Sequence, residues 1–219
     1  MNTPWSRLLT AIHGGCLMAA FGTTVAAAAP SFADSLGKNY AAPAGEGKEL
    51  LGTKPGEWTV SEWINSKPLT LESLRGKVVL VRWWTAPGCP YCVASAPALK
   101  EFWQKYKHKG LVVVGLYHHK SDAPLTRNHV KEQARKLGFD FPVAIDANWE
   151  TLRRWWLSKN KGGWTSVTFL LDRDGVIRHI HPGGAFYQGE PGYEALQRAL
   201  NDLCQQPISR NIDYLAPPR

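Results

Sequence analysis

Cysteine and runs of like charge are both scarce in this sequence. Only four of the 219 residues are cysteine, and only one pair has a C-x-x-C spacing. Structural zinc sites take four ligands, usually from two close pairs, so the missing second pair disfavours structural zinc. The net charge is +8, but lysine and arginine are scattered without a long run. We therefore interpret the basic excess as a solvated surface. A nucleic-acid partner is not expected because it conflicts with the export signal described next.

No long, strongly hydrophobic run is present either. The first 33 residues instead have the features of a signal peptide: Arg7 provides positive charge, residues 8–29 are apolar and small, and Ser31 and Ala33 suit signal peptidase. Export to the periplasm follows, with no stable membrane insertion after cleavage. A retained anchor, or lipid on Cys16, is the alternative.

The remaining chain is long enough for one domain with a good core. Residues 34–56 are rich in Gly, Ala, Pro and Lys without a period and are predicted to be a linker, and residues 206–219 a flexible tail. The domain between them covers residues 57–205. Its apolar patterns predict strands at 57–64, 78–81, 111–116, 141–145, 167–172 and 176–181. Helices are predicted after the cysteines, from Thr126 or Asn128 to Gly138, from Asn148 to Ser158, and from Pro191 to Cys204.

The C-x-x-C pair, Cys89 and Cys92, follows a buried strand and opens a helix. The start of a helix presents unpaired N–H groups and partial positive charge, which favour a thiolate at Cys89. Pro90 suits the first helical turn. Cys92 lies one turn deeper, close enough to close a small disulfide ring. We predict that Cys89 attacks a substrate sulfur and that Cys92 resolves the mixed disulfide.

The sequence resembles the thioredoxin superfamily, and within it the TlpA/ResA-like extracytoplasmic thiol–disulfide oxidoreductases. The matching segments are LTLESLRGKVVLVRWW, CPYC, Pro97, GLVVVGLYHHK, FPVAIDANWETLRRWW and SVTFLLDRDGVIRHIHPGG. The resemblance implies a three-layer α/β sandwich with a mixed central sheet flanked by helices. It also implies protein thiols and disulfides as substrates, a membrane protein as electron donor or acceptor, no cofactor and no metal, and reductase more than oxidase activity.

The chain departs from this family at three positions. Ser166, after Thr165, stands where the superfamily has a cis-proline, and a trans bond is expected there because a non-proline cis bond costs roughly 3 kcal/mol. Ser95 replaces a glutamate common in reductive members. The buried acid of thioredoxin corresponds to Arg82 or Trp83, neither of which is a carboxylate.

We expect the substrate to contact residues around the cysteines and in the facing loop: Trp84, Pro90, Tyr91, Thr165 and Ser166. Cys204 remains without a partner and is predicted to be a small apolar residue on the packed face of the last helix, with intermolecular pairing as the alternative.

Other functions stay open at this point. Four histidines near strand ends, with the cysteines, could build a copper(I) or zinc site, which suggests a metallochaperone: His118, His119, His179 and His181. A peroxiredoxin-like thiol peroxidase and a binding module with an inert disulfide are the further alternatives.

Overall fold

The computed structural model describes residues 45–159 and 163–206. The predicted signal peptide, the first part of the predicted linker and all of the tail after Gln206 lie outside these residues. The elements in chain order are η2 (Lys48–Leu50), β1 (Trp63–Ile64), β2 (Val78–Trp84), α2 (Pro90–Tyr106), η3 (Lys107–Lys109), β3 (Leu111–Tyr117), α3 (Arg127–Lys136), β4 (Val143–Ile145), α4 (Glu150–Leu152), η4 (Arg153–Leu157), β5 (Thr168–Leu171), β6 (Ile177–His181) and α5 (Pro191–Gln205).

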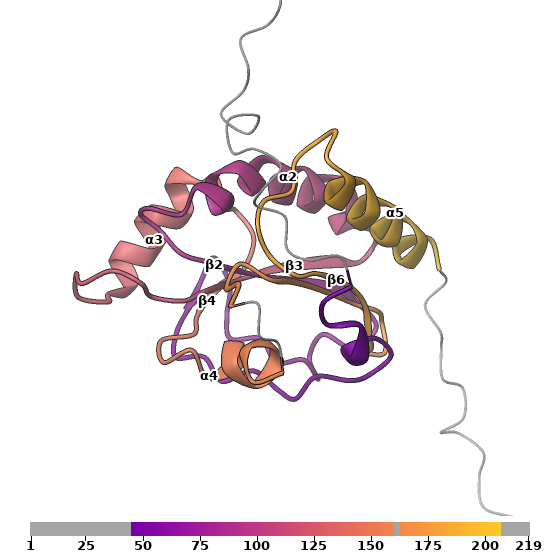
Figure 1. Cartoon of the computed structure of the whole chain (residues 1–219), viewed down its shortest axis with the longest axis horizontal. Coiled ribbons are helices and arrows are strands. Elements are labelled where there is room, and N and C mark those ends of the chain that lie inside the picture. Colours follow the sequence, from indigo (N-terminus) through magenta and orange to yellow (C-terminus); the bar gives the residue numbers. More distant parts are fainter. Residues whose placement is uncertain (1–44, 160–162, 207–219) are drawn as a thin grey trace, which may run out of the picture. The chain divides into compact units, whose positions relative to one another are not determined.

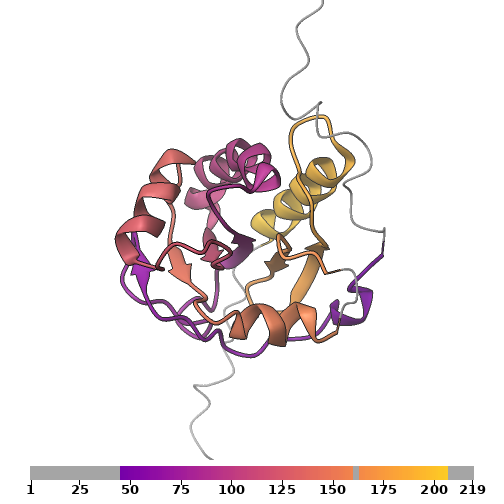
Figure 2. The ribbon, with the colours of Figure 1, turned by 60° about the vertical axis from the view of Figure 1, so that its left-hand side comes forward.

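Six strands form one mixed sheet in the order β1-β4-β3-β2-β5-β6. The central strand β2 runs parallel to β3 and antiparallel to β5. All seven residues of β2 are buried, as expected for an apolar strand covered on both faces. Helices α2, α3 and α5 cover one face of the sheet and α4 covers the other (Figure 1; Figure 2). The predicted α/β sandwich with a mixed sheet is confirmed.

Alternation along β2 divides the core into two layers. Val78, Leu80 and Trp84 belong to the cluster under α2 and α5. Val79, Val81 and Trp83 belong to the cluster on the α4 side. Because successive strand residues point to opposite faces, Arg82 lies on the α2 side, and its hydrogen bond to Ser95 of α2 agrees with this placement. Of the two positions that could match the thioredoxin acid, the structure places Arg82 beneath the helix that carries the cysteines.

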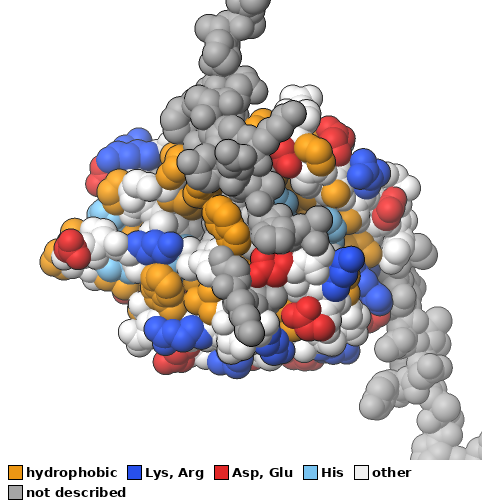
Figure 3. Space-filling view, in the orientation of Figure 1, with side chains coloured by type: hydrophobic (Ala, Val, Ile, Leu, Met, Phe, Trp, Pro, Cys, Tyr) orange, Lys and Arg blue, Asp and Glu red, His pale blue; other side chains and the backbone are white. Residues whose placement is uncertain are grey.

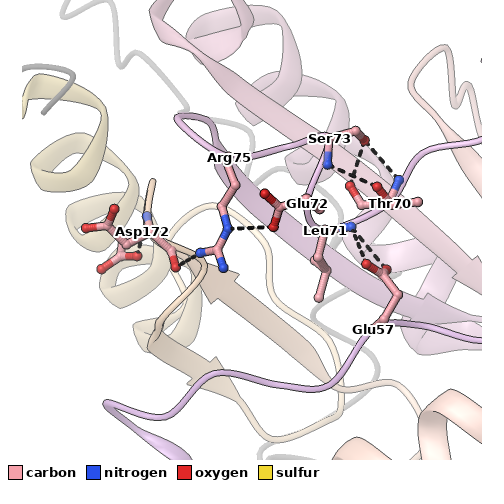
Figure 4. A network of polar contacts seen from close by, with 8 residues as sticks. Glu57, Thr70, Leu71, Glu72, Ser73, Arg75 and Asp172 are labelled. Atoms are coloured by element: carbon pink, nitrogen blue, oxygen red, sulfur yellow. Dashed lines mark hydrogen bonds and ion pairs between the residues drawn. The ribbon is translucent and has the colours of Figure 1, made fainter. Parts of the chain in front are cut away.

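A polar network fixes the segment between β1 and β2 (Figure 4). The Glu57 carboxylate accepts the backbone N–H of Leu71 at 3.0 and 2.9 Å. Thr70 and Ser73 exchange hydrogen bonds, while Arg75 pairs with Glu72 at 3.4 Å and donates to the Asp174 carbonyl. This segment is thereby tied to the turn between β5 and β6.

The linker predicted over residues 34–56 differs from the structure in its last part. Residues 45–56 pack on the domain: Leu50 is buried, Gly52 N donates to Ile177 O at 2.9 Å, and Ile177 N donates to Thr53 O at 2.9 Å. Glycine and proline in this stretch mark turns against the edge strand β6 rather than a free linker. The strand predicted over 57–64 is also shorter, since only Trp63 and Ile64 pair with β4.

The helix predicted from Asn148 begins differently. Trp149 is the N-cap residue of α4, in the left-handed region with φ of 60°. Asp146 supplies the acceptors, taking the N–H of Thr151 at 3.2 Å and of Leu152 at 2.9 Å. The helix continues as one wide π-helical turn, η4. Thr126, by contrast, caps α3 through the N–H of His129, one of the two starts predicted.

The distribution of charged side chains on the surface agrees with the scattered lysines and arginines of the sequence. Lys and Arg side chains are interspersed with Asp and Glu on the face shown in Figure 3. None of the described helices is both long and apolar enough to cross a membrane.

Candidate active site

Cys89 and Cys92 form a disulfide at the start of α2, as predicted. Cys89 is the N-cap residue, and its Sγ accepts the backbone N–H of Cys92 at 3.1 Å. Pro90 occupies the first turn, where its missing N–H leaves no helical bond unmade. Cys92 is buried at 2% exposure, whereas Cys89 is half-buried. Cys89 is therefore the sulfur that a substrate can reach.

A pocket of about 210 Å³ opens beside Cys89. It lies at the carboxyl ends of the parallel strands β2 and β3, where α/β sheets commonly place their sites. Three segments line it: the start of α2 with the loop before it, the end of β3, and the loop before β5. The lining residues are Thr85, Gly88, Cys89, Pro90, Tyr91, His118, Lys120, Gly163, Trp164, Thr165 and Ser166.

Four of the five predicted substrate contacts lie in this pocket with Cys89: Pro90, Tyr91, Thr165 and Ser166. The fifth, Trp84, does not. It is 1% exposed and packs edge-on against Tyr117 and Phe139 in the core under α2. Because strand residues alternate between the two faces of the sheet, the Trp84 side chain points toward α2. The predicted contact between Trp84 and substrate is therefore wrong.

The loop before β5 adds a residue that the sequence analysis missed. Trp164 packs edge-on against Tyr91, with ring centroids 5.6 Å apart, and forms one wall of the pocket. Its backbone carbonyl accepts the indole N–H of Trp156 at 2.9 Å, which anchors the loop to η4. The neighbouring Thr165–Ser166 bond is trans, as expected, and Ala86–Pro87 is the cis bond of the described residues. The one sequence feature that could have indicated this role is the position of Trp164 directly before Thr165.

Arg82 connects the segments around the disulfide. Its guanidinium donates to the carbonyls of Ser166 and Gly184 and to Thr168 Oγ1, and approaches Ser95 Oγ at 3.5 Å. It also lies 5.0 Å from the Phe186 ring centroid. Burial lowers the pKa of Arg82 to about 9, so the side chain is still charged at neutral pH.

Ser95, at the position of the family's glutamate, is fully buried and accepts the N–H of Phe186 at 3.0 Å. It thus serves the packing of α2 against the loop before α5. The described pocket residues include no carboxylate, so proton transfer at Cys92 must use water or another group.

His118 and His119 have separate environments. His118 follows β3, is fully buried, packs edge-on against Trp149 at 5.2 Å, and lines the pocket. Neither of its ring nitrogens has a hydrogen-bond partner in the described part of the chain. Burial and the charge of Lys120 lower the pKa of His118 to about 3, with Trp84's carbonyl acting in the opposite direction. His119 instead bonds to the Tyr117 hydroxyl and the Ala123 carbonyl.

His179 and His181 lie away from the cysteines. They line a separate pocket of about 430 Å³ between the start of η2, β6 and the start of α5. Across residues 45–159 and 163–206, no cluster of three or more His, Cys, Asp or Glu side chains is placed to hold a metal ion. Cys204 is free and buried at 7% exposure, on the packed face of α5 as predicted.

The fold and this helix-opening C-x-x-C disulfide define a thioredoxin-like protein. A model of the Redoxin family matches residues 60–196, and the chain belongs to this family as a TlpA/ResA-like member of the thioredoxin superfamily.

Three similar proteins show how far the likeness extends. Protein DipZ of Mycobacterium tuberculosis is 34% identical over 77% of this chain, but the match covers only 24% of DipZ, so the chain spans about a quarter of its length. Thiol-disulfide oxidoreductase ResA of Bacillus cereus is 28% identical over 72% of this chain and 81% of ResA. A solved thiol-disulfide isomerase from Corynebacterium glutamicum superposes with a TM-score of 0.55 and 26% identity, over 70% of this chain and 97% of that one.

Proposed function

We propose that the protein is a periplasmic thiol–disulfide oxidoreductase that exchanges disulfides with protein substrates through the CPYC pair. The single observation that carries the proposal is the unequal exposure of the two sulfurs at the start of α2. Cys89 is accessible beside the pocket, and Cys92 is buried behind it. The similarity to ResA and to the isomerase from Corynebacterium glutamicum supports the same activity.

Exchange needs no cofactor because the dithiol carries the two electrons. In the reducing direction the Cys89 thiolate attacks one substrate sulfur, forms a mixed disulfide and releases the other sulfur as a thiolate. The thiolate of Cys92 then attacks Cys89 Sγ, which restores the Cys89–Cys92 bond and frees the second substrate sulfur. The reverse sequence oxidises a substrate dithiol.

The start of α2 stabilises the Cys89 thiolate in this cycle. The N–H of Cys92 already points at Cys89 Sγ, and α2 continues for 17 residues, which places the positive end of its dipole at this sulfur. The rims of the pocket, Tyr91 and Trp164, offer apolar surface to the residues flanking a substrate cysteine.

The periplasmic location of the protein is part of the same proposal. The predicted signal peptide over residues 1–33 supports export, and the resemblance to extracytoplasmic family members supports a membrane protein as redox partner. After cleavage we expect no stable membrane insertion, because the apolar stretch over residues 8–29 is only weakly hydrophobic and is removed with the signal peptide.

An exchange assay on wild type, Cys89→Ser and Cys92→Ser tests the proposal. Full-length protein is mixed with oxidised insulin and a thiol reductant, and insulin reduction is followed by precipitation of its B chain. We expect activity from wild type and background rates from both variants. Full turnover by either variant would contradict the mechanism. Tight copper(I) binding by a protein inactive in exchange would instead favour the metallochaperone.

A further inference from the structure

Two cations lie near the disulfide in the part of the chain that the structure describes, Lys120 in the pocket and Arg82 beneath α2. The pocket beside Cys89 is lined by Lys120 and by no aspartate or glutamate of the described chain. Burial lowers the pKa of Lys120, and its charge also acts on the ring of His118. A second cation, Arg82, lies beneath α2 and holds the Ser166 carbonyl at the pocket's edge.

Among residues 45–159 and 163–206, Arg82 has no counter-charge while the cysteines are oxidised. It is 1% exposed, and all four of its acceptors are neutral: two backbone carbonyls and two hydroxyls. Its Nε has no acceptor, and none of the ion pairs among the described residues includes it. A buried cation without a paired anion is costly, so any anion formed near it gains stability.

Reduction of the disulfide forms such an anion. Ser95, which Arg82 approaches at 3.5 Å, is three residues after Cys92 and therefore lies on the same face of α2, one turn along. The contact thus leads from the guanidinium to the turn of α2 that follows Cys92. A thiolate formed on reduction is attracted by Arg82 and Lys120, whereas the neutral disulfide is not.

We infer that Arg82, assisted by Lys120, favours the thiolate form over the disulfide, so that Cys89–Cys92 acts as an acceptor of electrons from protein dithiols. The inference rests on the proposed exchange activity and gives it a direction. Arg82 acts by stabilising the negative charge of the thiolate and need not touch the substrate, so it is a positioning residue. This direction is opposite to the reductase activity that the family resemblance suggests.

The reaction balances with a protein dithiol as the reductant. Two substrate thiols lose two electrons and become a disulfide, while the Cys89–Cys92 bond breaks. Of the two protons released, one goes to the thiol of Cys92 and one to solvent, because Cys89 stays a thiolate. Arg82 and Lys120 stabilise that product charge.

The test is redox equilibration of the full chain with glutathione, with the state of Cys89 and Cys92 read by alkylation and peptide mass spectrometry. Arg82→Met removes the buried charge at similar length, and Lys120→Met removes the pocket cation. Lys100→Met is the matched control, since Lys100 is an exposed lysine of α2 that does not line the pocket. Urea unfolding of the reduced and oxidised forms of each protein is measured in parallel.

We expect Arg82→Met to lower the equilibrium constant for reduction about tenfold or more, which corresponds to about 30 mV for this two-electron couple. Lys120→Met should lower it by roughly threefold because its charge is screened by solvent, and Lys100→Met should leave it unchanged. In wild type, the free energy of unfolding should be higher for the reduced form than for the oxidised form. In Arg82→Met this difference between the two forms should be smaller. A purely structural role would lower the stability of both forms alike.

Two results would overturn the inference while leaving the proposed function intact. One is an unchanged equilibrium constant in an Arg82→Met protein that still exchanges thiols. The other, which decides the matter if Arg82→Met fails to fold, is a wild-type disulfide form that is as stable as the reduced form or more so. A wild-type protein that does not exchange with glutathione at all removes the proposed function and this inference together.

Discussion

The backbone N–H of Cys92 donates to Cys89 Sγ over 3.1 Å, so the first turn of α2 is already organised around the sulfur that a substrate can reach. The same sulfur occupies the N-cap position, where a negative charge is most favoured. The expected chemistry of the site depends on this contact between Cys92 and Cys89.

The first prediction concerns the acidity of Cys89. The N–H of Cys92 and the helix dipole favour the thiolate, so the pKa of the Cys89 thiol in the reduced protein should lie below about 8.5, the value of a free cysteine. The rate of Cys89 alkylation by iodoacetamide, followed from pH 4 to 10 by peptide mass spectrometry, measures it. A midpoint at or above 8.5 would contradict this role of the helix start.

Trp164 provides the second prediction. Its side chain lines the pocket and packs on Tyr91, while its anchoring bond to Trp156 uses only the backbone. Trp164→Ala should therefore slow exchange with a protein substrate several-fold but leave exchange with glutathione nearly unchanged. Trp103→Ala, at a half-buried tryptophan of α2 outside the pocket, is the control. Equal effects on both substrates would show that Trp164 serves folding rather than recognition.

Asp146 is expected to be a residue of stability and not of exchange. Its carboxylate accepts two N–H groups at the start of α4 and the indole N–H of the buried Trp83 at 3.1 Å. Asp146→Ala leaves these donors unpaired, so the free energy of unfolding should fall by about 2–4 kcal/mol. Urea denaturation measures the loss, with the exposed Asp140→Ala as control. The folded variant should exchange thiols at the wild-type rate, and a loss below 1 kcal/mol would refute this role.

Two buried histidines predict a loss of stability in acid. Burial lowers the pKa of His118 and His181 to about 3, from the ordinary value of 6.5. Between these pH values the unfolded chain binds protons that the folded chain does not, so stability falls as the pH drops below 6.5. Each histidine should contribute about 1.4 kcal/mol per pH unit across that window.

Urea unfolding at several pH values, on wild type and His181→Gln, measures this slope. The variant should be less sensitive to acid between pH 6 and 4, while His108→Gln at an exposed position should match wild type. An unchanged slope in His181→Gln would mean that His181 takes up its proton in the folded state.

Cys204 gives a prediction about reactivity. Burial raises the pKa of its thiol, and it lies on the packed face of α5. Native protein should therefore resist alkylation at Cys204, as followed by mass spectrometry of its peptide, until urea unfolds the domain. Rapid labelling in the native state, or a disulfide-linked dimer through Cys204, would support the alternative of intermolecular pairing.

Much of the fold could be predicted because the apolar runs are strong. The β-branched run from Val78 and the run from Leu111 predicted two buried strands, which the structure pairs in parallel at the centre of the sheet. The start of α4 was missed because its cap acts over five and six residues: Asp146, not the nearer Asn148, accepts the N–H groups of Thr151 and Leu152. The packed segment before β1 was also missed, since Leu50 alone gives no periodic signal.

The site was predictable only as far as the local motif extends. Cys89, Pro90 and Tyr91 follow from the strand–loop–helix pattern, and Thr165 and Ser166 from the family resemblance. The places of His118 and Lys120 depend on β3 pairing in parallel with β2, which brings the ends of both strands together. The sequence places Arg82 on its strand. The face of the sheet to which its side chain points could not be predicted, because a shift of one residue in the family alignment moves the matching position to the opposite face.

Capture of a mixed disulfide by the full-length Cys92→Ser variant tests most directly whether Cys89 is the nucleophile. The reduced variant is incubated with a peptide that contains one disulfide, quenched with acid, and mapped by mass spectrometry. We expect one peptide half joined to Cys89, and none in the Cys89→Ser variant. Absence of the adduct, or its attachment to another cysteine, would contradict the assignment of Cys89 as the nucleophile.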